Sequence, residues 1–209
     1  MTLLLFPELP SEPPLPLAWP VDHSPSRLAV TDANRAAAAW LAAPALWPVP
    51  VTLLIGAPGS GKSHLAGWFA AHHDGLVIEA ADTHEPERLF HAWNAATPAR
   101  PLLLTSQRPP RDWHHGLPDL ASRLAATPLI RLGEPDDELL GLVLAKLFTD
   151  RGIKVGDDLI RWLVVRIERS LGAAQAVVAR LDAEALARHR AITIPLAREV
   201  VDGQGEMGF

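Results

Sequence analysis

The chain has 209 residues, 24 acidic and 19 basic side chains, a formal net charge of −5 and no cysteine. Without cysteine it can form neither a disulfide framework nor a thiolate site, and this usage is typical of the reducing cytoplasm. No dense cluster of lysine and arginine appears along the sequence. A broad surface that neutralises duplex phosphates is therefore not expected, and neither is direct sequence-specific DNA binding.

Residues 1–26 stand apart because they hold seven prolines. Proline fixes φ and removes a backbone donor, so regular structure cannot run through this segment, and we predict a flexible, proline-rich leader. Residues 2–6 are apolar, but they lack a basic flank and lead into prolines. They match neither a signal peptide nor a membrane span, so no membrane association is expected.

Residues 27–133 show strands that alternate with helices. Apolar runs predict strands over residues 49–55, 76–81, 101–106 and 128–132. Helical patterns follow a cap at Thr31 or Asp32, begin again at His64 and return over residues 85–94. Because strands and helices alternate at this spacing, we predict an α/β base with a parallel sheet covered on both faces.

The pattern becomes purely helical after residue 133, and we predict a small all-helical subdomain over residues 134–209. An aspartate at 136 or 137 is a suitable N-cap for the first of its helices. Helices are predicted to end at Phe148 and to cover residues 157–167, 173–189 and 195–201.

A glycine-rich turn lies between the first predicted strand and the next helix. It comprises Gly56, Ala57, Pro58, Gly59, Ser60, Gly61, Lys62 and Ser63, with His64 directly after it. Glycines let backbone N–H groups point at an anion, and the following helix N-terminus adds partial positive charge. In such a loop the lysine reaches the β- and γ-phosphates and the serine hydroxyl binds Mg²⁺. The turn therefore predicts a nucleoside phosphate site, with Ser63 as a metal ligand.

Further motifs follow this loop in a characteristic order. They are the strand and turn over residues 104–110, the segment over 117–124, the helical stretch over 136–181 and the closing segment over 192–201, with Asn34 in a box before the first strand. Together they resemble the AAA+ ATPases of the DnaA branch, and most closely the DnaA-homologous regulators of the Hda type. The resemblance covers about residues 15–201 and implies an AAA+ base with a helical lid and ADP or ATP with Mg²⁺ as cofactors.

The resemblance implies a catalytic role for Arg123, which would act as an arginine finger on the nucleotide of a neighbouring subunit. The alternative is a surface arginine that pairs with Asp119. The family's adjacent acidic pair would hold Mg²⁺ and polarise water. Here its candidates are Glu79 and Asp82, and Glu79 could equally be a solvated carboxylate at a strand end.

Two further departures from the family pattern concern the length of the base and the lid. Fewer residues lie between Lys62 and Ser106 than the family usually spends, so the sheet is expected to be shortened by one strand–helix unit. The lid arginine of the family falls on Gly172 by alignment, with Arg169 as the nearest substitute. Because both the acidic pair and the lid arginine depart from the family pattern, slow hydrolysis or binding without turnover is expected, and whether the chain is itself an enzyme stays open.

The leader contains a candidate partner motif at residues 12–17. Hda-type proteins carry there a hexapeptide that docks on the sliding clamp, the β subunit of DNA polymerase III. This chain keeps Leu15, Pro16 and Leu17 but has Glu12 where the family has glutamine. Prolines extend the peptide in advance and lower its ordering cost on binding. The alternative is a tail that packs on its own domain or has no partner.

The motifs favour a cytoplasmic regulator of replication initiation that docks on the clamp and promotes hydrolysis of DnaA-bound ATP. Because only eight residues follow the last lid segment, we expect no helix-turn-helix domain there. The alternatives are a DnaA-like adaptor that recruits or sequesters replication proteins without hydrolysis, and a small-molecule P-loop kinase. The sequence leaves the oligomeric state open, a homodimer included, as well as the preference for ADP or ATP.

Overall fold

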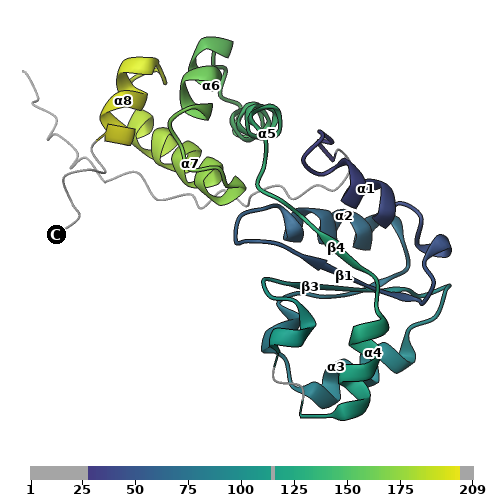
Figure 1. Ribbon diagram of the computed structural model, residues 1–209. Helices are drawn as coiled ribbons and strands as arrows, with labels where there is room; N and C mark the ends of the chain where they lie inside the picture. Colours follow the sequence, from purple (N-terminus) through teal and green to yellow (C-terminus); the bar gives the residue numbers. More distant parts are fainter. Residues whose placement is uncertain (1–27, 114–115, 203–209) are drawn as a thin grey trace, which may run out of the picture.

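The computed structural model describes residues 28–113 and 116–202 and has two parts (Figure 1). In the first part, four parallel strands form one sheet in the order β2-β3-β1-β4. The strands are β1 (Val51–Ile55), β2 (Leu76–Ile78), β3 (Leu102–Ser106) and β4 (Leu129–Arg131). The helices of this part are α1 (Arg35–Leu41), α2 (Lys62–His72), α3 (Pro86–Ala95) and α4 (Pro118–Ala126), with the 3₁₀ turns η1 (Pro44–Leu46), η2 (Ala81–Thr83) and η3 (Pro110–Asp112).

Two apolar cores cover the two faces of this sheet. On the face of α1 and α2, Leu54 packs with Leu65 and Phe69. On the face of α3 and α4, the neighbouring strand residues Leu53 and Ile55 join a separate core. This alternation follows from the period of two in a strand, and both core strands are fully buried because helices cover both faces. The predicted α/β base with a short parallel sheet is confirmed.

The second part is an all-helical lid built from α5 (Asp137–Asp150), α6 (Asp157–Val164), α7 (Leu171–Ala187) and α8 (Ile194–Asp202). Its own core gathers large side chains from all four helices, among them Phe148, Leu163, Leu181 and Leu196. Figure 1 shows the lid helices beyond one end of the base, next to α1 and α2. Over residues 28–113 and 116–202, every helix is too short or too polar to cross a bilayer.

The largest differences from the sequence prediction are at three boundaries, and two of them have a clear local reason. The first helix begins at Arg35 instead of after Thr31, because Asn34 braces the preceding turn by accepting from the Thr31 amide and donating to the Ala29 carbonyl. The second strand stops at Ile78 because Ala80 adopts a left-handed conformation with φ of 49° and turns the chain. The helix predicted over residues 157–167 ends at Val164.

Gly75 and Gly67 give a matched pair for testing the packing of α2. A Cβ atom at Gly75 would lie 2.5 Å from Cε1 of the buried Phe69 ring and 3.0 Å from the Pro101 carbonyl, whereas one at Gly67 would meet nothing within 4 Å. We expect Gly75→Ala to lower the free energy of unfolding by about 1–3 kcal/mol. Gly67→Ala should raise it by roughly 0.5–1 kcal/mol, because alanine favours an exposed helix interior. Urea unfolding at pH 7 measures both, and a Gly75→Ala variant as stable as the parent would contradict the packing described.

Candidate functional site

The glycine-rich loop lies at the carboxyl end of the central strand β1, where open α/β sheets place their ligands. Two of its glycines have positive φ, 73° at Gly59 and 104° at Gly61, which residues with a Cβ rarely adopt. Gly61 is the N-cap of α2, so the axis of that helix begins directly at the loop. The local sequence therefore forms a glycine-dependent turn that leads from the strand into the helix N-terminus.

The loop is also enclosed on both sides. A Cβ atom at Gly56 would lie 2.6 Å from the Leu132 carbonyl and 2.8 Å from Oγ of Ser60, and one at Gly59 would lie 2.7 Å from Cβ of Ser170. Oγ of Ser60 is buried with no hydrogen-bond partner. A buried hydroxyl without a partner carries a free-energy cost, so the inner surface of the loop retains polar capacity for a ligand.

Lys62 folds back over this loop. Its Nζ donates to the carbonyls of Gly56 and Ala57, at 2.8 Å each. Burial lowers the pKa of the Lys62 ammonium below its ordinary value, while the carboxylates of Glu79 and Asp82 oppose that shift. Lys62 thus lies over the loop, and both acidic candidates are near enough to affect its pKa.

Glu79 and Ser63 meet at the other side of the loop. Oγ of Ser63 donates a hydrogen bond to Oε2 of Glu79, and the main-chain oxygen of Glu79 lies 3.0 Å from Nε2 of His84. Glu79 follows β2, and the left-handed Ala80 begins the turn that leads away from it. A hydroxyl and a carboxylate side by side are hard oxygen donors of the kind that Mg²⁺ prefers. Within residues 28–113 and 116–202, no larger group of acidic and histidine side chains gathers as around a metal.

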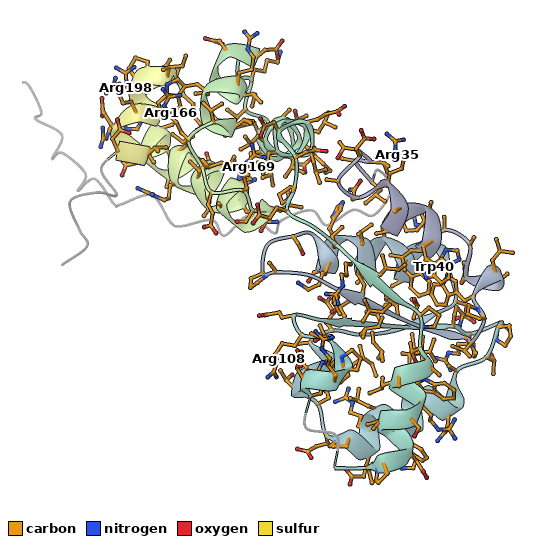
Figure 2. All side chains as sticks on the ribbon, in the orientation of Figure 1. Arg35, Trp40, Arg108, Arg166, Arg169 and Arg198 are labelled. Carbon is orange, nitrogen blue, oxygen red and sulfur yellow. The ribbon has the colours of Figure 1, made fainter. Side chains whose placement is uncertain are left out.

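Asp82 takes a different position from Glu79. Its carboxylate Oδ2 accepts from Nε of Arg108 at 3.1 Å, and its side chain is only 8% exposed. Arg108 belongs to the turn after β3, at the carboxyl end of that strand (Figure 2). The two acidic candidates are therefore divided: Glu79 faces the loop serine, and Asp82 anchors the turn after β3. Sequence reasoning missed Arg108 as the partner of Asp82.

The lid touches the loop directly through the start of α7. The amide of Leu171 donates to the Gly59 carbonyl at 2.7 Å, and Cδ1 of Leu171 lies 3.1 Å from the place of a Cβ on Gly61. The position that the family pattern gives to a lid arginine is Gly172, which follows in the same turn. Its proposed substitute, Arg169, forms an ion pair with Asp137 at 2.7 Å on the lid (Figure 2).

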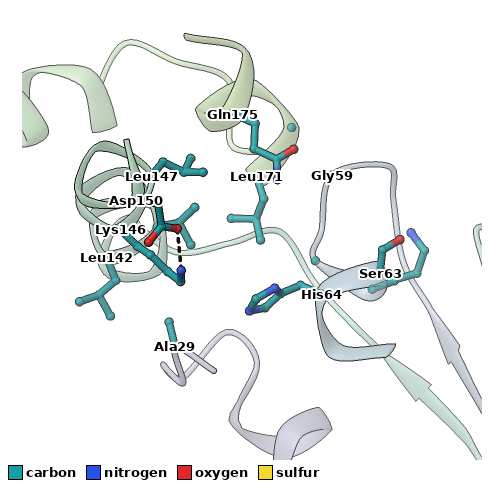
Figure 3. Close-up of a pocket in the computed structure, with 14 residues that line it drawn as sticks. Ala29, Gly59, Ser63, His64, Leu142, Lys146, Leu147, Asp150, Leu171 and Gln175 are labelled. Carbon is teal, nitrogen blue, oxygen red and sulfur yellow. Dashed lines mark hydrogen bonds and ion pairs between the residues drawn. The ribbon is translucent and has the colours of Figure 1, made fainter. Parts of the chain in front are cut away.

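A pocket of about 340 Å³ opens between the loop and the lid. Figure 3 shows it with His64 and Ser63 on the α2 side, Leu171 and Gln175 on α7, and the Lys146–Asp150 ion pair across from them on α5. Sequence reasoning identified only the loop side. On the lid side, residues 142, 143, 146, 147 and 150 share one face of α5, and this helical spacing was the available signal.

Arg123 lies on the other face of the base from the loop helix, on α4. Its guanidinium carbon is 4.6 Å from the centre of the Trp93 ring and 5.3 Å from that of Phe90, both on α3. Among the ion pairs of the described residues, none joins Arg123 to Asp119. The structure thus separates Arg123 from the loop of its own chain. Leu15, Pro16 and Leu17 lie outside the described residues.

The loop and its neighbours fit a nucleotide phosphate with a magnesium ion. The backbone is packed too closely at Gly56 and Gly59 for a side chain, the N-terminus of α2 begins at the loop, and Lys62 lies over it. Ser63 with Glu79 offers the oxygen ligands. The pocket toward the lid extends from these residues past Leu171 to the apolar face of α5.

Comparison with known proteins gives one family match and several similar folds. Residues 140–201 match the family model described as Hda, lid domain. Domain III of the replication initiation protein DnaA from Thermotoga maritima aligns with a TM-score of 0.73 and 14% identity, over 88% of this chain and 97% of that one. A replication initiator DnaA bound to AMPPCP and single-stranded DNA aligns with a TM-score of 0.63 and 14% identity, over 81% and 68%. The RuvB branch migration motor of Thermotoga maritima aligns with 0.59 and 14%, over 82% and 68%.

The parallel sheet and the helical lid give the chain the fold that these DnaA and RuvB structures share. Within that fold, the lid sequence over residues 140–201 is of the Hda type.

Asp136 joins the lid to the segment before α1. Its Oδ1 accepts from the Leu139 amide at 2.7 Å and caps α5, and its Oδ2 accepts from the Ala33 amide at 3.1 Å. Burial, the largest single influence, would raise the pKa of this carboxyl, but the two amide donors, the side chain of Thr31 and the charge of Arg169 together outweigh it, so the pKa lies below its ordinary value.

Replacing Asp136 tests this junction. We expect Asp136→Ala to lower the free energy of unfolding by about 1 kcal/mol at pH 7, while Asp136→Asn keeps the cap and most of the stability. Because the pKa is lower in the folded state, the contribution of the charge is full above about pH 4 and is lost as the pH falls through the folded pKa. Thermal unfolding at pH 7 and pH 3 measures both effects. Equal stability of the parent and the alanine variant at pH 7 would show that the hydrogen bonds of Asp136 do not stabilise the fold.

Proposed function

We propose that this protein is a nucleotide-binding regulator of chromosomal replication initiation that promotes hydrolysis of DnaA-bound ATP. The observation that carries the proposal is the combination of a complete phosphate loop with a lid of the Hda family in a chain of DnaA fold. Both DnaA structures bound to AMPPCP have this fold at 14% identity, which supports an adenine nucleotide as the ligand.

In this proposal the loop residues bind ADP or ATP. The amides of residues 56–63 would surround the phosphates, and Lys62 would exchange its contacts with the loop carbonyls for the phosphate oxygens. Ser63 and Glu79 would hold Mg²⁺, which neutralises phosphate charge when it is bound. The nucleoside would lie toward the pocket that His64 and Leu171 line.

The site supports binding better than turnover by this chain alone. Asp82, the second acidic candidate, is held by Arg108, and Gly172 and Arg169 offer no free cation near the loop. We therefore place hydrolysis at the nucleotide of a neighbouring DnaA subunit. Arg123, on the opposite face of the base, would reach that nucleotide as an arginine finger. Bound nucleotide would then serve mainly to stabilise the folded chain for assembly.

We further propose that the leader docks on the sliding clamp through Leu15, Pro16 and Leu17. Two leucines separated by a proline would offer apolar anchors for a pocket on the clamp, since proline favours an extended backbone. A short peptide of this kind binds weakly alone, but a ring with repeated pockets raises the effective concentration for an oligomeric partner.

A second candidate is an adaptor that recruits or sequesters DnaA without affecting hydrolysis. It is favoured by the divided acidic residues and by the absence, among the described residues, of a lid cation at the loop. The two candidates differ in one measurable quantity, the rate at which DnaA-bound ATP is hydrolysed.

Calorimetric titration tests the nucleotide site. We expect ADP with Mg²⁺ to bind the parent, and Lys62→Ala to weaken binding by about tenfold to a hundredfold, because charge-assisted hydrogen bonds to phosphate are lost. Lys154→Ala, which removes an exposed lysine of the lid, is the matched control and should bind as the parent does. Undiminished affinity in the Lys62 variant would remove the basis for the proposed site.

Hydrolysis of DnaA-bound ATP, measured with the sliding clamp loaded on DNA, tests the regulator. Arg123→Ala should reduce the stimulated rate by about a hundredfold or more, since an arginine finger is worth on the order of 10³–10⁵ in rate. The controls are nucleotide binding and thermal stability, which should both stay near parental values. If Arg123→Ala stimulates as well as the parent, the finger role is wrong and the adaptor is favoured.

The same assay separates the leader from the finger. Leu15→Ala with Leu17→Ala should leave nucleotide binding intact but abolish capture of the clamp in a pull-down. Stimulation should fall only when clamp is limiting, because the leader raises local concentration and takes no part in the reaction. Full clamp capture by this double variant would place the contact elsewhere.

A further inference from the structure

The side chain of Arg123 is supported by Phe90 and Trp93 of α3 and by Thr127, the residue that follows α4. These three residues are called the seat of Arg123. Its guanidinium carbon is 4.6 Å from the ring centre of Trp93 and 5.3 Å from that of Phe90, which are cation–π distances. Both rings are half-buried, and they belong to the helix that packs beside α4 on the same face of the sheet. A long side chain that touches two ring faces keeps far fewer rotamers than one in open solvent.

Thr127 connects Trp93 to the backbone of Arg123 through two hydrogen bonds. The indole Nε1 of Trp93 donates to Oγ1 of Thr127 at 3.1 Å, and the same hydroxyl donates to the main-chain oxygen of Arg123 at 2.9 Å. Thr127 is only 7% exposed, so these hydrogen bonds are largely shielded from water. The orientation of the Trp93 ring is thereby tied to the very residue whose guanidinium it supports.

The seat leaves the binding edge of the guanidinium available. Stacking engages the faces of the planar group, whereas its N–H donors point outward in the plane. Across the ion pairs recorded for residues 28–113 and 116–202, none engages Arg123. Its planar donors are suited to bidentate contact with phosphate oxygens.

From this geometry we infer that Phe90, Trp93 and Thr127 are positioning residues that hold Arg123 ready for the phosphates of a partner's nucleotide. The inference rests on the proposed finger role of Arg123 and adds the residues that orient it. A finger held in advance loses less conformational entropy when it engages the phosphates in the transition state, after the partner has docked. The seat should therefore act on the maximal stimulated rate and leave the affinity for the partner nearly unchanged.

The test compares variants in stimulated hydrolysis of DnaA-bound ATP, measured over a range of concentrations of the regulator. Trp93→Leu should lower the maximal rate by about tenfold and Phe90→Leu by about threefold, in keeping with the usual range for a cation–π contact, with the half-saturating concentration unchanged. Trp93→Phe, which keeps a ring face, should restore most of the rate. Trp162→Leu is the matched control, because Trp162 supports Arg166 in a similar stack on the lid at 4.3 Å.

A spectroscopic readout reports the seat without any partner. In the parent, the side-chain Hε signal of Arg123 should be shifted upfield by the ring currents of the two aromatic residues, and Trp93→Leu should return it toward the free value. Should Trp93→Leu fail to fold, as judged by circular dichroism, Phe90→Leu and Thr127→Val provide the same comparison from less buried or smaller changes.

The outcomes distinguish the seat from the finger. If Arg123→Ala abolishes stimulation while Trp93→Leu and Phe90→Leu keep the parental maximum or exceed it, the positioning role is overturned and the finger stands. If Arg123→Ala is itself as active as the parent, both fail. An unshifted Arg123 signal in the parent would overturn the seat directly.

Discussion

The carboxyl ends of three strands converge on Gly56, and the candidate site depends on that convergence. The Gly56 amide donates to the Ser106 carbonyl at the end of β3, and the Leu132 amide beyond β4 donates to the Ile55 carbonyl at the end of β1. A Cβ on Gly56 would lie 2.6 Å from the Leu132 carbonyl. Because no side chain fits, the strand ends can close around the loop, and the loop's geometry is set by the sheet that holds it.

Those parts of the fold whose geometry depends on neighbouring residues could be predicted from the sequence. The strand over residues 102–106 opens with three leucines in a row, a run that favours a buried strand, so its place in the sheet centre follows from composition and length. The loop was equally predictable, since positive φ at Gly59 and Gly61 needs glycine whatever surrounds it. The N-cap at Asp136 belongs to the same class, because its bond to the Leu139 amide spans only three residues.

Contacts between distant segments could not be predicted in this way. Asp82 and Glu79 are three residues apart and look alike in the sequence, yet a left-handed Ala80 between them sends one toward Arg108 and the other toward Ser63. Nothing near Arg123 in the sequence indicates the rings beneath it, which come from a helix about thirty residues earlier. Such pairings depend on how α3 and α4 lie on one face of the sheet, and local patterns do not encode that arrangement.

The amide of Leu171 has a mechanical consequence, because its acceptor is a carbonyl of the phosphate loop itself. The space beside Gly59 is also filled by Ser170 of the lid, so a Cβ there would collide with it. Together with the hydrogen bond from the Ala33 amide to Asp136, this contact fixes the orientation of the lid relative to the base. A surface on α6 or α8, far from the loop, therefore depends for its placement partly on the backbone at Gly59.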